Sequence, residues 1–250
     1  MRSWLGDLPE NVLRICQYGF VEMANNANDH SEASEVLISG GVEDGIVKMT
    51  ISDGGVGIFA KIKEFCRLDD DRTALLELTK GKLTTDPTRH TGEGIFFSSR
   101  MFDEFSILSG HLFLNYDQET DWLMDTQKNN NQGTVVQMKI STTSERTTKE
   151  VFDRYATDQN DFGFKQTTVS VKLAQTEGEV LLSRSHARRL LARLENFPEV
   201  VLDFNGVTEI TPAFADEIFR VWRKTHPETN LVPVRTSESV ERMIKKSQSA

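Results

Sequence analysis

Apolar and polar side chains follow two different periods along the first part of the chain. Between Glu10 and His30 the apolar positions recur about every 3.6 residues, which predicts one long amphipathic helix with Pro9 in a favourable place just before it. Residues 34–39 and 45–52 instead have strand-like patterns on either side of the segment GGVEDG, which indicates a hairpin.

Further elements are expected in the same region. The pattern predicts a helix at about 59–67, a stretch around 72–80, a helix over 93–103, and strands at 104–109, 111–116, 120–125 and 133–141. Helices on one side and antiparallel hairpins on the other form a two-layer α/β sandwich.

The last part of the chain alternates strands and helices. Strands are predicted at 167–174, 199–204 and 230–234, and helices at 184–196, 212–225 and 237–246. This order predicts a small α/β domain with a largely parallel or mixed sheet. We therefore divide the 250 residues into a first domain (1–142), a linker with a short helix (143–165) and a second domain (166–250).

Charge separates the two domains. Residues 1–142 hold 13 Lys and Arg against 22 Asp and Glu, a net charge of −9, whereas residues 143–250 hold 16 against 16. Because phosphate backbones require clustered cations, this argues against a nucleic-acid surface. Apolar runs stay far below the roughly 20 residues of a membrane span, and the N-terminus lacks a signal-peptide pattern. Two distant cysteines fit no metal-ligand spacing, so a cytoplasmic location is expected.

Three polar residues lie on one face of the first long helix. Glu22, Asn26 and Asp29 are four and three residues apart. A carboxylate and an amide one turn apart can orient water and offer oxygen ligands to Mg²⁺. Taken alone, the trio is more typical of a solvated polar face.

Glycine-rich segments follow a strand and precede a helix. Asp53 begins the sequence DGGVGI, in which Gly55 and Gly57 would let a ligand approach the backbone and Ile58 follows directly. The Asp53 carboxylate can accept a hydrogen bond from an exocyclic amine. A tight strand-to-helix turn explains this segment equally well.

A second glycine-rich segment opens the helix near residue 93. Its exposed amides at a helix N-terminus would suit phosphate. The preceding loop from Gly81 to Gly94 would cover a triphosphate with the cations Lys80, Lys82 and Arg89. The segment consists of His90, Thr91, Gly92, Glu93, Gly94 and Ile95. Gly133 and Thr134, in a late strand, complete the set but have almost no specificity alone.

Together, in this order and spacing, the four segments resemble the conserved boxes of the GHKL ATPase superfamily over roughly residues 10–142. The resemblance implies a Bergerat-type nucleotide pocket for ATP and Mg²⁺. It implies Glu22 as general base, Asn26 as Mg²⁺ ligand, and Asp53 as acceptor for the adenine amine. The remaining cofactor-binding residues implied around these are Asp29, Gly55, Gly57, Ile58, His90, Thr91, Gly92, Glu93, Gly94, Ile95 and Thr134.

The second domain resembles STAS-like domains found fused behind GHKL ATPases, over about residues 166–246. Where anti-sigma-factor antagonists have a phosphorylatable Ser after an Asp, this chain has Thr211 and Pro212, so the usual acceptor is missing and Thr211 or Thr208 would have to substitute. An arginine-rich helix could dock an acidic partner, although a solvated face is the more common arrangement. Its arginines are Arg184, Arg188, Arg189 and Arg193.

These features predict a Mg²⁺-dependent ATP-binding protein, and Glu22 favours slow hydrolysis that resets contacts with the STAS-like domain or another protein partner. Two alternatives stay open: an anti-sigma-type serine/threonine kinase, which would share every pocket residue, and a non-catalytic nucleotide sensor. A homodimer is also left open, and no membrane partner is expected.

Overall fold

The computed structural model describes residues 1–84, 92–117, 121–126, 131–156, 164–175 and 182–249. The chain divides into two compact units, Met1–Asp153 and Arg154–Ala250, here called the N-terminal and C-terminal units. Each unit combines helices with a sheet, so the predicted α/β class is confirmed. Among the described residues, no helix combines the length and apolar character needed to cross a bilayer.

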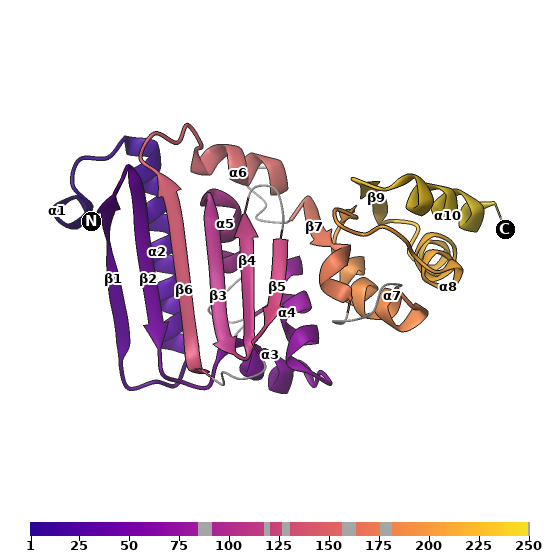
Figure 1. Ribbon diagram of the computed structural model, residues 1–250, viewed down its shortest axis with the longest axis horizontal. Coiled ribbons are helices and arrows are strands. Elements are labelled where there is room, and N and C mark those ends of the chain that lie inside the picture. Colours follow the sequence, from indigo (N-terminus) through magenta and orange to yellow (C-terminus); the bar gives the residue numbers. More distant parts are fainter. Residues whose placement is uncertain (85–91, 118–120, 127–130, 157–163, 176–181, 250) are drawn as a thin grey trace. The chain divides into compact units, whose positions relative to one another are not determined.

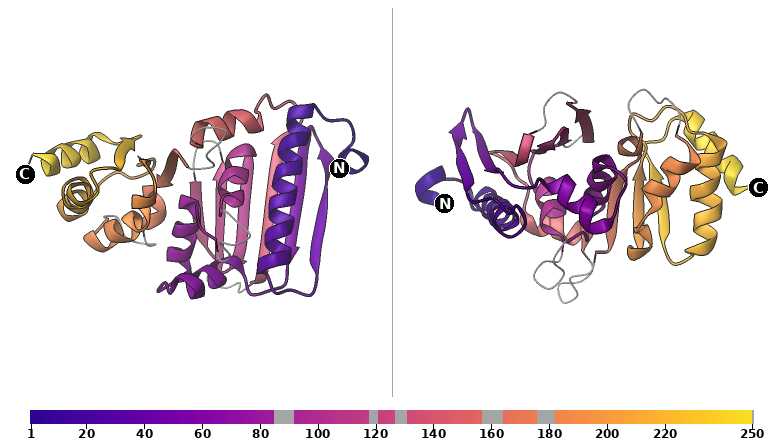
Figure 2. Two further views of the ribbon diagram at one scale, coloured as in Figure 1. Left: turned by 180° about the vertical axis from the view of Figure 1, so that it is seen from behind. Right: turned by 90° about the horizontal axis from the view of Figure 1, so that it is seen from below.

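The N-terminal unit has one antiparallel sheet with helices on one face (Figures 1 and 2). In the described residues its six strands run in the order β1-β2-β6-β3-β4-β5. The strands are β1 (Val36–Glu43), β2 (Ile46–Asp53), β3 (Glu104–Gly110), β4 (Leu112–Asp117), β5 (Asp121–Asp125) and β6 (Asn131–Ser141). The helices are α1 (Arg2–Leu5), α2 (Glu10–His30), α3 (Ile58–Cys66), α4 (Asp71–Lys80), α5 (Gly94–Met101) and α6 (Thr148–Tyr155).

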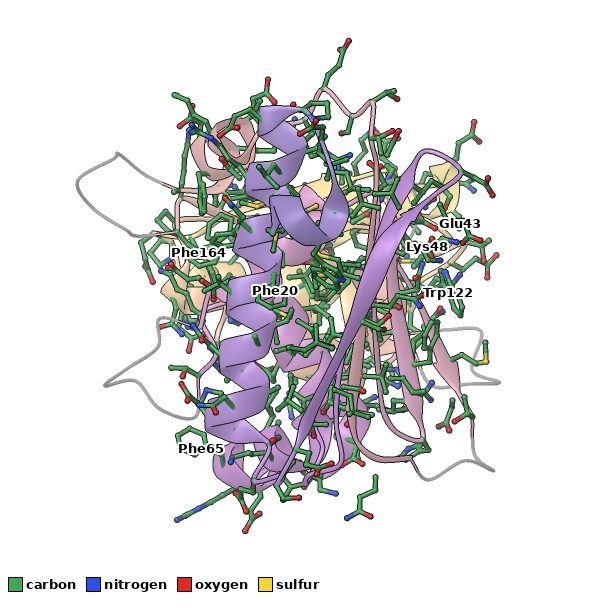
Figure 3. All side chains as sticks on the ribbon, turned by 90° about the vertical axis from the view of Figure 1, so that its left-hand side faces the viewer. Phe20, Glu43, Lys48, Phe65, Trp122 and Phe164 are labelled. Carbon is green, nitrogen blue, oxygen red and sulfur yellow. The ribbon has the colours of Figure 1, made fainter. Side chains whose placement is uncertain are left out.

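The period of two along the strands decides which face is covered. On β2, Val47, Met49 and Ile51 are buried towards the helices, and the residues between them are more exposed. Figure 3 shows Lys48 and Trp122 projecting from the face opposite α2. The core of this unit therefore lies between the helices and one face of the sheet.

The long helix α2 follows the predicted boundaries, and close packing fixes it to the core. A Cβ added to Gly19 would lie 2.4 Å from a ring carbon of Phe102, so only glycine permits this approach. The Asn11 amide donates to the backbone oxygens of Ser144 and Arg146 at 2.7 and 3.0 Å, which ties the start of the helix to the end of the sheet.

The first hairpin is tighter than the sequence suggests. Only Asp44 and Gly45 form the turn, both with positive φ (51° and 74°), as a two-residue type I′ turn requires. Gly40 and Gly41, expected in the turn, instead belong to β1, which lies at the edge of the sheet. The prediction that the segment GGVEDG is the turn was therefore wrong in its extent.

The C-terminal unit has a parallel sheet with the order β7-β8-β9 in the described residues. Its strands are β7 (Gln166–Ser170), β8 (Glu199–Asp203) and β9 (Asn230–Val234), and its helices are α7 (Arg184–Leu191), α8 (Pro212–Asp216), α9 (Arg223–Thr225) and α10 (Glu238–Gln248). Residues 171–174, predicted as strand, form a 3₁₀ turn (η1), and residues 194–196 form another (η2). Between α8 and α9 the helix takes a π-helical form (η3, Glu217–Trp222).

Candidate functional site

One cavity of about 350 Å³ opens beside the second half of α2 in the N-terminal unit. It lies within the size range of small-molecule sites. Its wall includes residues from all four segments that the sequence singled out, although these are up to 112 residues apart (Glu22 to Thr134). The predicted site residues that line it are Glu22, Asn26, Asp53, Gly57, Ile58, Gly92, Glu93, Gly94, Ile95 and Thr134.

Two predicted residues that the structure describes, Asp29 and Gly55, are not part of the cavity wall. Asp29 is exposed on α2, where its Oδ1 accepts a hydrogen bond of 2.7 Å from the Asn28 amide. Gly55 packs against the end of α2, since an added Cβ would lie 1.9 Å from the Ser31 carbonyl oxygen. His90 and Thr91 fall outside the described residues.

Asp53 ends β2 at one side of the cavity, and backbone amides hold its carboxylate. Its Oδ1 accepts hydrogen bonds from the Gly55 and Thr134 N–H groups, at 2.9 and 3.3 Å. Among the described residues these two bonds engage only Oδ1, so Oδ2 is left for a donor in the cavity. The carboxylate is thus fixed in orientation before any ligand arrives.

Two hydroxyls support the turn between Asp53 and α3. The N–H of Ile58 donates to both Ser109 Oγ (3.1 Å) and Thr134 Oγ1 (3.0 Å). Ser109 Oγ in turn donates to the Gly133 carbonyl oxygen at 2.9 Å. Gly57 has φ +82°, and an added Cβ would lie 2.8 Å from Ser109 Oγ. Sequence reasoning missed Ser109, because a serine in an alternating strand resembles an ordinary solvent-facing residue.

The carboxylate of Glu22 lies directly against the start of α5. A Cβ added to Gly94 would be 2.1 Å from Glu22 Oε2, so a side chain at this position would displace the Glu22 carboxylate. Gly92, with φ +75°, comes equally close to the backbone of Leu83, where an added Cβ would be 2.5 Å from the carbonyl carbon. The first amides of α5 have no partner within the helix, as at every helix start, and Gly94 and Ile95 line this end of the cavity.

Tyr18, one turn before Glu22 on α2, is a further residue that the sequence did not single out. Burial raises the pKa of its phenol above the ordinary value, and the carboxylates of Glu22 and Glu93 raise it further. The phenol therefore stays protonated and uncharged near these two carboxylates at neutral pH. A tyrosine within an apolar helical stripe gives no signal of this kind in the sequence.

A lysine also lines the cavity at the end of α2. Lys61 Nζ donates to the His30 carbonyl oxygen at 2.6 Å and to Glu32 Oε1 at 2.9 Å. His30 itself is part of the cavity wall. The lysine thus stabilises the C-terminal end of α2, where helix carbonyls lack partners.

Lys80 does not act as a loop cation in this structure. It ends α4 with a fully buried side chain, and its Nζ lies 2.5 Å from Glu77 Oε1. The expectation that Lys80 would cover a triphosphate was therefore wrong. Lys82 lies just before the undescribed part of the loop, and Arg89 lies within it.

The oxygen atoms around the cavity suit a cation that is held partly by the protein and partly by a bound ligand. Within the described residues, His, Cys, Asp and Glu side chains do not gather in threes at any point that could hold a metal ion. Mg²⁺ usually takes only one or two protein oxygens and completes its shell with water and phosphate. Asn26, in the wall beside Glu22, offers one such oxygen.

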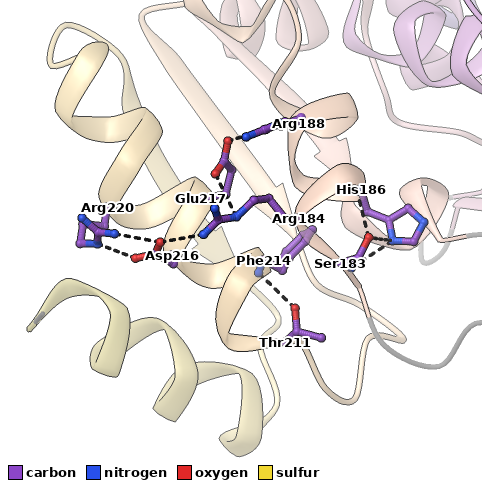
Figure 4. Close-up of polar contacts among 9 residues, drawn as sticks. All are labelled: Ser183, Arg184, His186, Arg188, Thr211, Phe214, Asp216, Glu217 and Arg220. Atoms are coloured by element: carbon purple, nitrogen blue, oxygen red, sulfur yellow. Dashed lines mark hydrogen bonds and ion pairs between the residues drawn. The ribbon is translucent and has the colours of Figure 1, made fainter.

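In the C-terminal unit, acidic side chains of the same unit pair with two arginines of α7 (Figure 4). Arg184 lies 3.3 Å from Asp216 and 3.4 Å from Glu217, and Arg188 lies 2.9 Å from Glu217. Arg220 also pairs with Asp216. These contacts hold α7 against the π-helical segment. Arg184 and Arg188 thus have acidic partners within their own unit.

Hydroxyl side chains begin both helices in this region. Ser183 Oγ accepts from the His186 N–H, and the Ser183 N–H donates to His186 Nδ1 at 3.0 Å, which forms a capping box. Thr211 Oγ1 accepts from the Phe214 N–H at 3.1 Å and donates to the Leu182 carbonyl oxygen at 2.6 Å. Thr211 is therefore a helix cap in this structure (Figure 4).

The C-terminal unit is a small α/β domain whose parallel strands alternate with helices. Residues 186–241 match the family model of a STAS-like domain of unknown function (DUF4325), so the predicted resemblance of this part to STAS-like domains is confirmed. A search of curated proteins gives no match to the chain.

Proposed function

We propose that the N-terminal unit binds ATP with Mg²⁺ in the cavity beside α2 and hydrolyses it slowly, as the GHKL resemblance implies. The observation that carries this proposal is that one cavity of about 350 Å³ is lined from all four segments of that resemblance. If the four motifs occurred by chance, we would not expect their residues to line the same cavity.

Asp53 would bind the adenine end of the nucleotide. Its Oδ1 is engaged by two backbone amides, and its Oδ2 would accept a hydrogen bond from the exocyclic amine. Because those amides fix the carboxylate beforehand, little side-chain entropy is lost on binding. The Ser109 and Thr134 hydroxyls would preserve the shape of this end through Ile58.

The start of α5 would bind the phosphates. The amides of its first turn and the helix dipole favour negative charge, and Gly94 lets a phosphate come near Glu22. Mg²⁺, held partly by Asn26, would supply neutralisation of phosphate charge. Glu22 would take a proton from a water molecule as the water oxygen attacks the γ-phosphorus and ADP leaves with the bridging oxygen.

Nucleotide occupancy would then alter contacts of the C-terminal unit or of a separate protein partner. This part of the proposal depends on the resemblance of the second domain to STAS-like domains that are fused behind GHKL ATPases. The match of residues 186–241 to a STAS-like family model supports the STAS-like nature of that domain. We place the protein in the cytoplasm.

The test is nucleotide binding by calorimetry together with phosphate release. Wild-type protein should bind Mg²⁺-ATP, and Glu22→Ala should keep binding but lose turnover. Asp53→Asn should weaken adenine-nucleotide binding at least about tenfold, a loss of about 1.4 kcal/mol that is typical of a hydrogen bond to a charged group. Asp29→Asn is the matched control, because Asp29 is exposed outside the cavity, and it should bind as wild type does.

Three results would change the proposal. Unchanged phosphate release in Glu22→Ala would remove that residue from the chemistry. Transfer of labelled phosphate from ATP to a protein in cell lysate would favour the serine/threonine kinase. Tight binding without any turnover would favour the nucleotide sensor.

A further inference from the structure

Helix α6 belongs to both units of the chain. It spans Thr148–Tyr155, and the division between the units falls inside it, after Asp153. On the far side of that division, the Tyr155 carbonyl oxygen accepts a hydrogen bond of 2.7 Å from the Lys165 N–H. Tyr155, in the C-terminal unit, is thus the last residue of a helix that begins in the N-terminal unit.

Phe152 attaches α6 to two helices of the N-terminal unit. Its ring lies 5.5 Å from the Tyr18 ring, nearly perpendicular to it at 86°, and 4.6 Å from the Phe97 ring at 49°. Tyr18 belongs to α2 and Phe97 to α5, so one side chain contacts both helices. Such ring pairs contribute stabilisation beyond their buried area and are sensitive to geometry.

The same two helices carry the end of the cavity proposed for phosphate. Tyr18 lies one turn before Glu22 on α2, and Phe97 lies about one turn after Gly94 on α5. Between them, Glu22 Oε2 is 2.1 Å from the position of a Cβ on Gly94, so α2 and α5 are in close contact there. A ligand that enters between Glu22 and Gly94 must act on the spacing of the two helices that hold Phe152.

We propose that Phe152 couples occupancy of the cavity to the C-terminal unit through α6. This inference rests on the proposed nucleotide site and adds the route by which that site regulates the rest of the chain. Phosphate at the start of α5 fixes α5 relative to α2. That fixation stabilises the Tyr18–Phe152–Phe97 contact and, through the helix, the hydrogen bond from Lys165 to Tyr155.

The experiment uses the full chain and two readouts, with a non-hydrolysable ATP analogue and Mg²⁺ as the probe. Amide hydrogen exchange of residues 151–155 and of Lys165 should slow at least about fivefold on binding, the lower end of typical coupling between sites. Phe152→Ala should abolish this change. Because coupling is reciprocal, the same variant should raise the Kd of the analogue, measured by calorimetry, by the same factor.

Two further variants control for general damage to the fold. Phe65→Ala makes the same chemical change on α3, where the ring is 54% exposed, and should alter neither readout. Phe152→Leu keeps part of the packing, so it should weaken the slowing of exchange and raise the Kd of the analogue less than Phe152→Ala does. The factor of change should again be the same for exchange and for Kd. Phe152→Leu also provides a test if Phe152→Ala fails to fold.

The outcomes separate this inference from the proposed function. If wild-type protein binds the analogue but exchange at 151–155 and Lys165 stays the same, the coupling is refuted and the nucleotide site stands. If exchange and affinity change by unequal factors in the Phe152 variants, the coupling is also refuted. If wild-type protein does not bind the analogue, both proposals are overturned.

Discussion

The shared hydrogen bond at Ile58 makes a quantitative prediction about stability. Its N–H has two acceptors, Ser109 Oγ at 3.1 Å and Thr134 Oγ1 at 3.0 Å. Removing either hydroxyl, by Ser109→Ala or Thr134→Val, leaves the other in place. Each loss of this shared bond should then cost only about 0.5–1 kcal/mol. Ser109→Ala costs more in total, because Ser109 also donates to the Gly133 carbonyl oxygen.

The double variant should cost more than the two single variants together. It leaves the partly buried Ile58 N–H without a protein acceptor, which adds about 1–2 kcal/mol as the penalty of an unsatisfied donor. The lost bond to Gly133 occurs both in Ser109→Ala and in the double variant, so it cancels in the comparison. The long contact of 3.4 Å between the two hydroxyls is lost in each single variant and once in the double variant, so it lowers the excess slightly. With a urea m-value of about 2 kcal/mol/M, the excess equals a midpoint shift of about 0.5–1 M.

Tryptophan fluorescence can measure the free energy of unfolding of the N-terminal unit alone. Two of the three tryptophans, Trp4 and Trp122, lie in residues 1–153, and Trp222 lies in the C-terminal unit. In a Trp222→Phe background, urea unfolding therefore follows only the N-terminal unit. Additivity of the two single substitutions within about 0.5 kcal/mol would refute the shared-donor interpretation.

Two further predictions concern the same unit. Gly133→Ala should destabilise this unit by more than about 2 kcal/mol in urea unfolding, because φ is +81° and the new Cβ would lie 1.9 Å from the Asp53 carbonyl oxygen. Gly54→Ala is the control and should be nearly neutral, because no atom lies within 4 Å of the added Cβ. Burial raises the pKa of Cys16 from 9.0 to about 12, so the unfolded chain loses this proton first and stability should fall between those pH values. The fall should be smaller in Cys16→Ala, in which only groups such as Tyr18, whose pKa is also raised, still contribute to it.

Strongly periodic elements were predictable because their pattern and their burial coincide. The face of α2 that carries Val12, Ile15 and Met23 is apolar in sequence and buried in the structure. The strands β3 to β6 also follow the predicted runs. Residues 171–174 misled the prediction, because two alternating apolar residues, Val171 and Leu173, are equally compatible with a short buried 3₁₀ turn.

The sequence indicated many of the residues that line the cavity, but not which side chains reach it. Asp29 shares a helical face with Glu22, yet its side chain is exposed and bonds to the Asn28 amide, whereas the next residue, His30, lines the cavity. Lys80 and Glu77 have the spacing of an ordinary exposed ion pair, and only the packing around α4 buries them. Ser109 needed the pairing of β3 with β6 before its contact with Gly133 could be known.

The strand order of the N-terminal sheet constrains how the chain can assemble. β6 lies between β2 and β3, although it is the last of these strands to be synthesised. Until residues 131–141 emerge, the β1–β2 hairpin and the β3–β4–β5 meander have no strand to join them, and each keeps an unpaired edge. The first 130 residues are therefore two separate pieces of sheet, and contacts distant in sequence must form before the cavity exists.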